Sequence, residues 1–137
     1  MRDLYDNVLV TQVSNPSTGN TARTSLAVDL QGFNSANLFV SLGQSADTLS
    51  GSVYWTLKLT HSNDDVTYVD ATTADIVSGN ATYVVNATTL DKTTYGFGYI
   101  GVRRYLKVVA TPTGTHTNGT PMAMIALRGH ASYSPVL

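Results

Sequence analysis

Residues 52–62, SVYWTLKLTHS, decide the fold class of this chain. Residues on one side of this segment are mostly apolar or aromatic, namely Val53, Trp55, Leu57, Leu59 and His61. The intervening residues are Tyr54, Thr56, Lys58 and Thr60. Strict alternation with a period of two is typical of a β-strand that buries one face. The segment therefore predicts a β-strand.

Similar short segments lie on both sides of this strand. Asn63-Asp64-Asp65 is typical of a turn, and residues 66–71, VTYVDA, are expected to return as the partner strand of a hairpin over 52–71. Other strands are expected at residues 25–30, where Leu26, Val28 and Leu30 share a face, and at 37–43, 81–87, 95–102, 103–112 and 122–131. We predict an all-β fold: a jelly-roll-like β-sandwich of about eight short antiparallel strands.

The whole chain of 137 residues has the length of a single domain. Residues 14–24, SNPSTGNTART, are rich in turn-forming residues, so residues 1–22 are expected to form a loosely attached N-terminal arm. Residues 128–137, RGHASYSPVL, are expected to form a C-terminal tail. No apolar run has the length of a signal peptide or a membrane span, so neither export by such a peptide nor membrane insertion is expected.

The composition favours a protein that makes contacts. Charged residues make up 12% of the chain, Thr occupies 20 positions, and all nine acidic residues are Asp. A surface with so few charges lacks the usual protection against association, which suggests a homo-oligomer or multiple symmetric copies. A net charge of −1 provides no basic footprint, so neither nucleic acid nor a membrane is expected as a partner.

The motifs that could support catalysis are weak. Residues 96–101 match GxGxxG, but β-forming residues surround them, whereas a dinucleotide site needs a helix after the glycines. His61, His116 and His130 lack the spacing of a zinc site, and the chain has no GxSxG motif. We therefore expect no enzyme activity, no cofactor and no metal, while a calcium site at Asp64, Asp65 and Asp70 remains an open alternative.

The run Arg103-Arg104-Tyr105-Leu106-Lys107 is the most concentrated charge in the sequence. On a strand, Arg103, Tyr105 and Lys107 would project from one face and Arg104 from the other, so the two arginines are expected to have different roles. One is expected to cover the sheet edge or pair with an Asp within the fold, and the other to contact a partner subunit. The equal alternative is that both are solvated or paired within the fold. Tyrosines 95, 99 and 105 could alternatively stack on sugars in a groove.

Several longer segments carry a resemblance to a known family. They are MRDLYDN at 1–7, residues 27–43, residues 59–71 and residues 95–136, in which GYIGVRRYLKV and RGHASYSPV are the most specific. Together they resemble small virion proteins of tailed bacteriophages and gene-transfer-agent-like particles. The resemblance implies a β-sandwich that decorates or cements a phage head and carries no catalytic residues.

The resemblance also implies a partner and a location. The expected partner is the major capsid protein, the expected location is the outer capsid surface of a virion made in the host cytoplasm, and the expected role is to stabilise contacts between capsid subunits. A carbohydrate-binding jelly roll at a head spike and a head-tail connector or tail component are the alternatives. The expected interface residues are Arg2, Leu4, Tyr5, Arg103, Arg104, Tyr105, Arg128, His130 and Tyr133.

Overall fold

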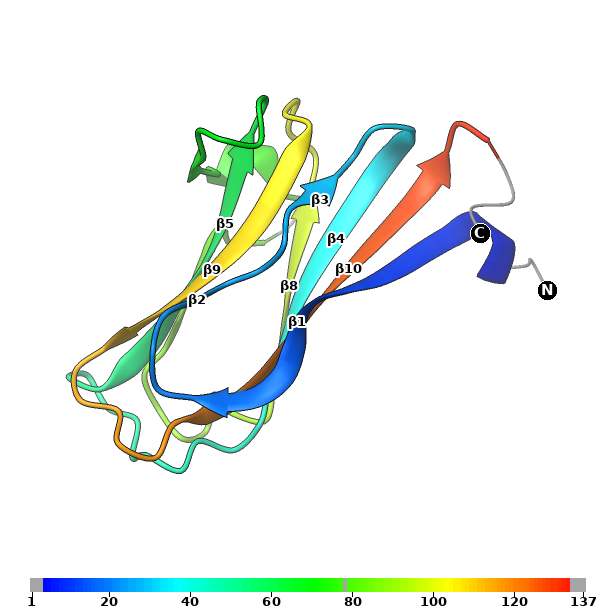
Figure 1. Cartoon of the computed structure of the whole chain (residues 1–137). Helices are drawn as coiled ribbons and strands as arrows, with labels where there is room; N and C mark the ends of the chain where they lie inside the picture. The colour runs from blue at the N-terminus through cyan, green and yellow to red at the C-terminus, as the bar shows by residue number, and fades with distance from the viewer. Residues whose placement is uncertain (1–3, 78, 134–137) are drawn as a thin grey trace.

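The computed structural model describes residues 4–77 and 79–133, and this part of the chain folds as two antiparallel sheets packed face to face (Figure 1). The four-stranded sheet contains, in spatial order, β1 (Val8–Gly19), β10 (Thr120–Ala131), β4 (Phe33–Leu42) and β8 (Thr94–Tyr99). The six-stranded sheet contains β2 (Arg23–Thr24), β3 (Val28–Asp29), β9 (Tyr105–Thr113), β5 (Tyr54–Ser62), β6 (Val69–Asp70) and β7 (Thr82–Val85). Two short 3₁₀ turns are η1 (Tyr5–Asn7) and η2 (Thr73–Asp75).

The strand order is that of a jelly roll. Strands β2 and β3 pair with successive parts of β9, and β6 and β7 pair with successive parts of β5, so each pair acts as one interrupted strand. Counted in this way, the described residues form eight strands whose sheets run 1-8-3-6 and 2-7-4-5. All connections except the fourth cross from one sheet to the other, as two Greek keys require. The sandwich and the jelly-roll order predicted from the sequence are confirmed.

The core lies where the inward faces of the two sheets meet. Trp55, Leu57 and Leu59 on β5 are almost fully buried, as the alternation in residues 52–62 predicts. Across from them, the inward side chains of β4, β8 and β10 include Leu38, Val40, Phe97 and Met124, which are fully buried. In β9, Leu106 and Val108 complete the core beside β5.

The predicted hairpin over residues 52–71 differs from the structure. β5 pairs along its whole length with β9, and only Val69–Asp70 return beside it as β6. The carboxylate of Asp64 accepts hydrogen bonds from the backbone amides of Val66 and Thr67, at 3.0 and 2.8 Å. These bonds hold the chain in a turn and keep residues 63–68 out of the ladder.

The N-terminal arm predicted for residues 1–22 is wrong for residues 8–19, which form β1 and pair with β10. The turn-forming residues that suggested a loop sit at two irregularities of this ladder, between Gln12 and Ser14 and between Ser14 and Ser17. These irregularities accommodate Pro16, which cannot donate a ladder hydrogen bond. Residues 128–131 of the predicted tail belong to β10, and 134–137 lie outside the described residues.

Residues 25–30 also differ from a continuous strand. Val28 is buried, but Leu26 is 70% exposed because its amide donates to the carbonyl of Val13 on the other sheet, at 2.8 Å. This bond draws the chain away from β9 between β2 and β3. Within residues 4–77 and 79–133, neither helical turn has the length or the apolar character that spanning a membrane would need.

Candidate functional site: an uncharged sheet face and an open end

The outward face of the four-stranded sheet carries no charged side chain on its paired positions. Cross-strand partners share a face of a sheet, and residues that alternate with buried positions point outward. Two rows cross the sheet on this side: Gln12, Ile125, Phe39, Gly96 and Val10, Leu127, Asn37, Gly98. A third row adds Ala123, Ser41 and Thr94. We call these eleven positions the uncharged face.

Apolar side chains occupy the middle of the uncharged face. Val10 is 59% exposed and Ile125 is 37% exposed, whereas Leu127 is half-buried. The ring of Phe39 lies over Gly96, where an added Cβ would come within 3.1 Å of it. Contiguous exposed apolar surface of this kind is typical of a protein contact.

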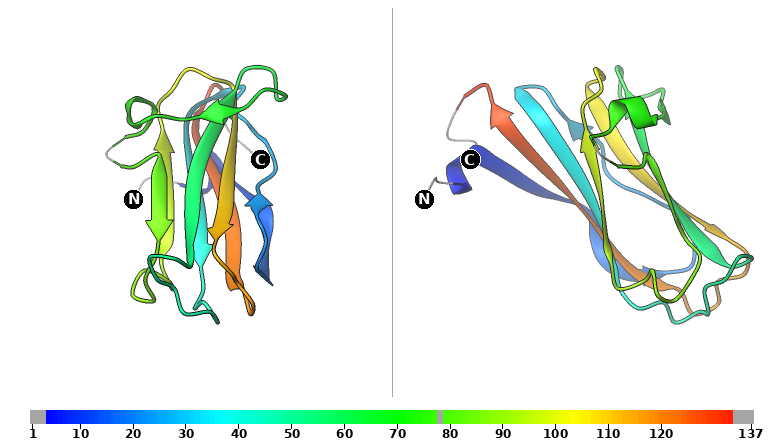
Figure 2. Two further views of the ribbon diagram at one scale, coloured as in Figure 1. Left: turned by 90° about the vertical axis from the view of Figure 1, so that its left-hand side faces the viewer. Right: turned by 180° about the vertical axis from the view of Figure 1, so that it is seen from behind.

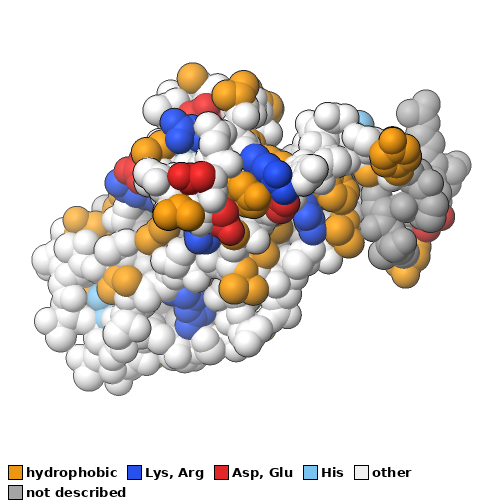
Figure 3. Space-filling view, turned by 45° about the horizontal axis from the view of Figure 1, so that its top comes forward, with side chains coloured by type: hydrophobic (Ala, Val, Ile, Leu, Met, Phe, Trp, Pro, Cys, Tyr) orange, Lys and Arg blue, Asp and Glu red, His pale blue; other side chains and the backbone are white. Residues whose placement is uncertain are grey.

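Ion pairs lie on the opposite side of the molecule. Lys58 pairs with Asp70 at 2.7 Å, and Lys107 lies 3.7 Å from Asp65 and above the ring of Tyr68. These residues belong to the six-stranded sheet and its loops, as does Asp29. Figure 3 shows charged and apolar side chains gathered over the upper part of the molecule, above a lower part that is mostly polar and uncharged. These two ion pairs therefore belong to the six-stranded sheet and its loops, whereas the paired outward positions of the four-stranded sheet carry no charge.

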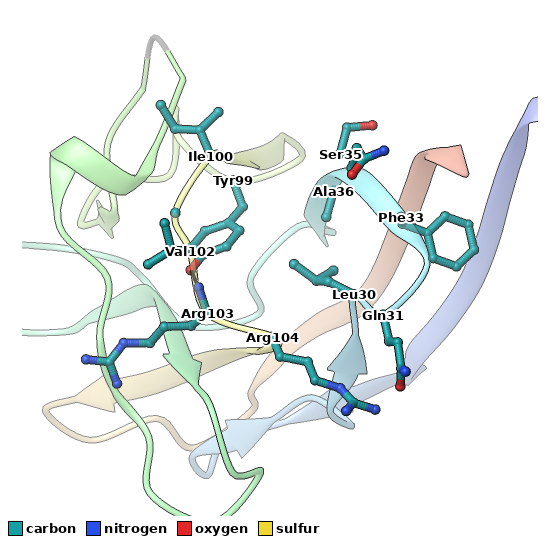
Figure 4. A pocket seen from close by; sticks show the side chains of 12 residues that line it. Leu30, Gln31, Phe33, Ser35, Ala36, Tyr99, Ile100, Val102, Arg103 and Arg104 are labelled. Atoms are coloured by element: carbon teal, nitrogen blue, oxygen red, sulfur yellow. Dashed lines mark hydrogen bonds between the residues drawn. The ribbon is translucent and has the colours of Figure 1, made fainter. Parts of the chain in front are cut away.

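At the upper end of the sandwich the two sheets separate around a half-open hollow of about 520 Å³ (Figure 4). The turn before β4 lines one side of the hollow, and the β8–β9 loop lines the other. Ile100 and Val102 in this loop are 58% and 99% exposed. Ile100 and Val102 thus form a second exposed apolar surface at the mouth of the hollow, which we call the open end.

The arginines expected at an interface meet at the open end around Asp29. Arg104 donates two hydrogen bonds to the Asp29 carboxylate, at 2.8 and 2.7 Å, and Arg128 donates to its carbonyl at 2.8 Å. The Arg104 guanidinium holds the pKa of Asp29 below its usual range. Arg128 also donates to Thr11 and lies over the ring of Phe33. The expected pairing of one arginine with an Asp is confirmed for Arg104.

The alternation expected for residues 103–107 does not extend to Arg104, because β9 begins one residue later, at Tyr105. Its guanidinium lies 4.9 Å from the centre of the half-buried Tyr105 ring. The backbone amide of Arg103 donates to the Tyr99 hydroxyl at 3.0 Å, and the Arg103 side chain lines the hollow. Contact between Arg103 and a partner remains a prediction.

Of the other expected interface residues, His130 lies beside the open end. His130 is exposed at the end of β10, and its Nδ1 lies 2.8 Å from the hydroxyl of Ser35. Leu4 and Tyr133 are 70% and 88% exposed, and Tyr5 is 74% exposed. Arg2 lies outside the described residues. The start of β1 and the end of β10 extend past the opposite sheet (Figure 2), and Leu4, Tyr5 and Tyr133 lie just beyond these two strand ends in the chain.

Tyrosines 95 and 99 do not form an exposed stacking surface for sugars. Tyr99 is 5% exposed, and Tyr95 packs against Tyr83 with the ring centres 5.1 Å apart. Both lie on the inward face of β8, since they alternate with Gly96 and Gly98. Gly96 and Gly98 of the GxGxxG match therefore belong to strand β8, where the lack of a side chain makes this edge of the uncharged face shallow, whereas Gly101 lies in the β8–β9 loop.

His61 is buried below the hollow, where its Nδ1 lies 2.9 Å from the Tyr99 hydroxyl. Burial lowers its pKa from 6.5, because the charged imidazolium loses its water. As the pH falls below 6.5, the unfolded chain takes up this proton before the folded chain does, so stability falls.

We expect His61→Gln to flatten this pH dependence. The melting temperature of the unsubstituted protein should fall between about pH 7 and pH 5 by more than that of the variant. Differential scanning calorimetry at matched ionic strength measures both slopes. Equal slopes would contradict the assignment to His61.

The lower end of the sandwich holds a buried polar network. The indole of Trp55 donates to Thr120 at 3.0 Å, Thr120 donates to Ser45 at 2.9 Å, and the Ser45 amide donates to Asp91 at 3.0 Å. His116 packs against Trp55. In the part of the chain that the structure describes, no three His, Cys, Asp or Glu side chains gather in a way that could hold a metal ion.

The uncharged face was missed at the level of the sequence. The sequence did contain a sign of this face: no charged residue occurs between Asp6 and Arg23, or between Asp29 and Asp47. These two stretches contain β1 and β4. Which residues of these strands point outward became visible only through their register with β10.

No protein family model matches the sequence, and no curated protein matches it. The SPBc2 prophage-derived protein YomS has a similar structure, with a TM-score of 0.49 and 11% identity over 89% of this chain and 92% of that chain. The capsid of Ralstonia phage GP4 has a TM-score of 0.40 and 11% identity, covering 97% of this chain and 90% of that one. A CBM4 structure has a TM-score of 0.39 and 14% identity, covering 93% and 70%. Because identities and TM-scores are low, these likenesses assign neither a family nor a function.

Proposed function

We propose that this protein is a non-enzymatic structural component of a virion, a decoration or cement protein that binds the outside of a tailed-phage head. The uncharged face is the observation that carries the proposal. It presents Val10, Ile125 and Phe39 on a sheet face that has no charged residue at its paired positions, whereas the opposite sheet carries ion pairs. A sheet face of this kind is suited to burial against another protein surface.

In the proposed complex, the uncharged face lies on the shell and the open end reaches a neighbouring capsid subunit. Ile100 and Val102 would bury their exposed side chains there, and Arg103 would pair with a carboxylate of the shell. Many copies on a symmetric lattice add the contacts of each copy to those of its neighbours, so a modest single contact is enough to stabilise the shell. The sequence resemblance to small virion proteins agrees with this role.

Replacing Ile125 by lysine tests the docking face. Ile125→Lys places an unpaired charge in the middle of the uncharged face, and we expect the affinity for purified capsids to fall at least tenfold, or about 1.4 kcal/mol. Co-sedimentation of the labelled protein with capsids measures binding. Thr56→Lys, at an outward position of β5 on the other sheet, is the matched control and should bind like the unsubstituted protein.

Heat resistance of the capsid tests the cement role itself. Capsids saturated with the protein should release their contents at a higher temperature than bare capsids. If the protein binds but leaves the release temperature unchanged, it decorates without cementing. If both lysine variants bind capsids equally well, the uncharged face is not the docking surface.

A further inference from the structure

The two sheets have four edges, and three of them are protected against pairing with another strand. At the β8 edge, Ile76 forms a bridge with Tyr99, and the amide of Val77 donates to Gly98 at 2.8 Å. The two edges of the six-stranded sheet consist of strands that are only two to four residues long. Coverage and shortness are both ways in which proteins prevent edge-to-edge association.

The fourth edge is β1, and its second half is protected as well. Pro16 and the two register irregularities interrupt the ladder between Gln12 and Ser17. The carbonyl of Val13 accepts from Leu26, and the carbonyl of Ser17 accepts from Arg23. A second strand could not pair regularly with this half.

The first half, Val8–Gln12, has none of these protections. The five residues VLVTQ contain no charge and no proline, and they pair with β10 in unbroken register. Their outer side has no partner strand among residues 4–77 and 79–133. In Figures 1 and 2 this part of β1 extends beyond the opposite sheet, so the second sheet does not cover it.

An apolar hollow of about 480 Å³ follows the same stretch. It is lined by Leu4, Tyr5, Val8, Leu9, Val10 and Leu127. Since Leu9 points to one face of the sheet and Val8 and Val10 to the other, the hollow borders both faces of the strand. An incoming strand would find backbone groups at the edge and apolar side chains above and below them.

We propose that Val8–Gln12 of β1 pairs with the same segment of a second copy of this chain, antiparallel and about a two-fold axis at Val10. The segment is self-complementary, because an identical strand brings no like charge against it. Centring the axis at Val10 lets all five residues pair: Val10 faces its own copy, Leu9 faces Thr11, and Val8 faces Gln12. A closed two-fold contact of this type leaves neither copy with an open β1 edge.

The pairing makes one continuous sheet of eight strands from two four-stranded sheets. A two-fold axis perpendicular to the sheet keeps equivalent faces on the same side, so the two uncharged faces form one surface of doubled width. The dimer is a property of the chain alone and does not depend on the proposed binding to capsids.

Charge substitutions at Val10 test the pairing and its register. Val10 is 59% exposed, so lysine or aspartate at this position has room in the folded monomer. We expect the unsubstituted protein to have twice the chain mass of 14.6 kDa by light scattering, and Val10→Lys and Val10→Asp each to be monomeric. Mixing the two variants in equal amounts should restore the dimer, because opposite charges then meet at the axis.

Ile125→Lys is the control, since Ile125 lies on β10, one strand away from the edge, and this variant should remain dimeric. Circular dichroism confirms that each variant is folded. A monomeric unsubstituted protein overturns the proposal, as does a dimer that both Val10 variants leave intact. If only a chain ending at Tyr133 dimerises, residues 134–137 occupy the edge and the proposal is likewise wrong. Since all samples lack capsids, each result is separate from the test of capsid binding.

Discussion

Replacing Leu57 by alanine is expected to lower the free energy of unfolding by about 3 kcal/mol. Leu57 is fully buried at the middle of β5, between Tyr83 on β7 and Ala110 on β9. Truncation removes buried methyl and methylene groups and leaves a cavity that strands paired on both sides cannot close. Urea denaturation followed by tryptophan fluorescence measures the loss through Trp55.

Val84→Ala is the matched control for Leu57→Ala. Val84 lies on the neighbouring strand β7, but its side chain is 47% exposed, so its truncation should cost less than about 1 kcal/mol. Equal losses for the two variants would mean that β5 is not the centre of the core.

Gly114→Ala is expected to lower the free energy of unfolding by at least about 2 kcal/mol. Gly114 has a φ of +80°, and an added Cβ would lie 2.2 Å from the backbone oxygen of Ser52. The substitution therefore combines left-handed strain with a backbone collision, so the turn after β9 must move away from the start of β5. Thermal or urea unfolding measures the cost.

Substitutions at two other glycines distinguish the cost of left-handed strain from the cost of the backbone collision. Gly32 has a φ of +85° but open space around the added Cβ, so Gly32→Ala reports the strain alone, about 1 kcal/mol. Gly51 has open space and no positive φ, so Gly51→Ala should change stability by less than about 0.5 kcal/mol. The predicted order of the losses, from largest to smallest, is Gly114, Gly32, Gly51, and a loss at Gly114 no larger than that at Gly32 would show that the turn after β9 tolerates a side chain.

Much of the fold could be predicted because the alternation of apolar and polar residues can be seen within a short stretch of sequence. Residues 52–62 and 122–131 alternate clearly, and both form strands close to the predicted ranges. The pairing of strands depends on segments far apart in the sequence. For this reason β5 was expected to pair with residues 66–71, whereas it pairs along its whole length with β9. The polar segment 14–19 was read as a loop, because its membership in β1 depends on its ladder with β10.

The candidate site could be predicted only in part. Charge density along the chain identified Arg103 and Arg104, and the structure shows that Arg104 and Arg128 share Asp29. No local pattern links residues 29, 104 and 128, since folding alone brings them together. The uncharged face was harder still to predict from the sequence. It is defined by the absence of charged side chains at the outward positions of four strands, and these strands are far apart in the sequence.

The position of β10 in the strand order constrains when this chain can fold. β10 lies between β1 and β4, and in the other sheet β9 lies between β5 and the pair β2 and β3. During synthesis, the first hundred residues therefore emerge before β10, which is the partner strand of β1 among the described residues, so β1 is unpaired and both sheets are divided. Neither sheet can close until residues 105–131 have left the ribosome, so we expect folding to follow translation, at the slow rates typical of sheets built from distant segments.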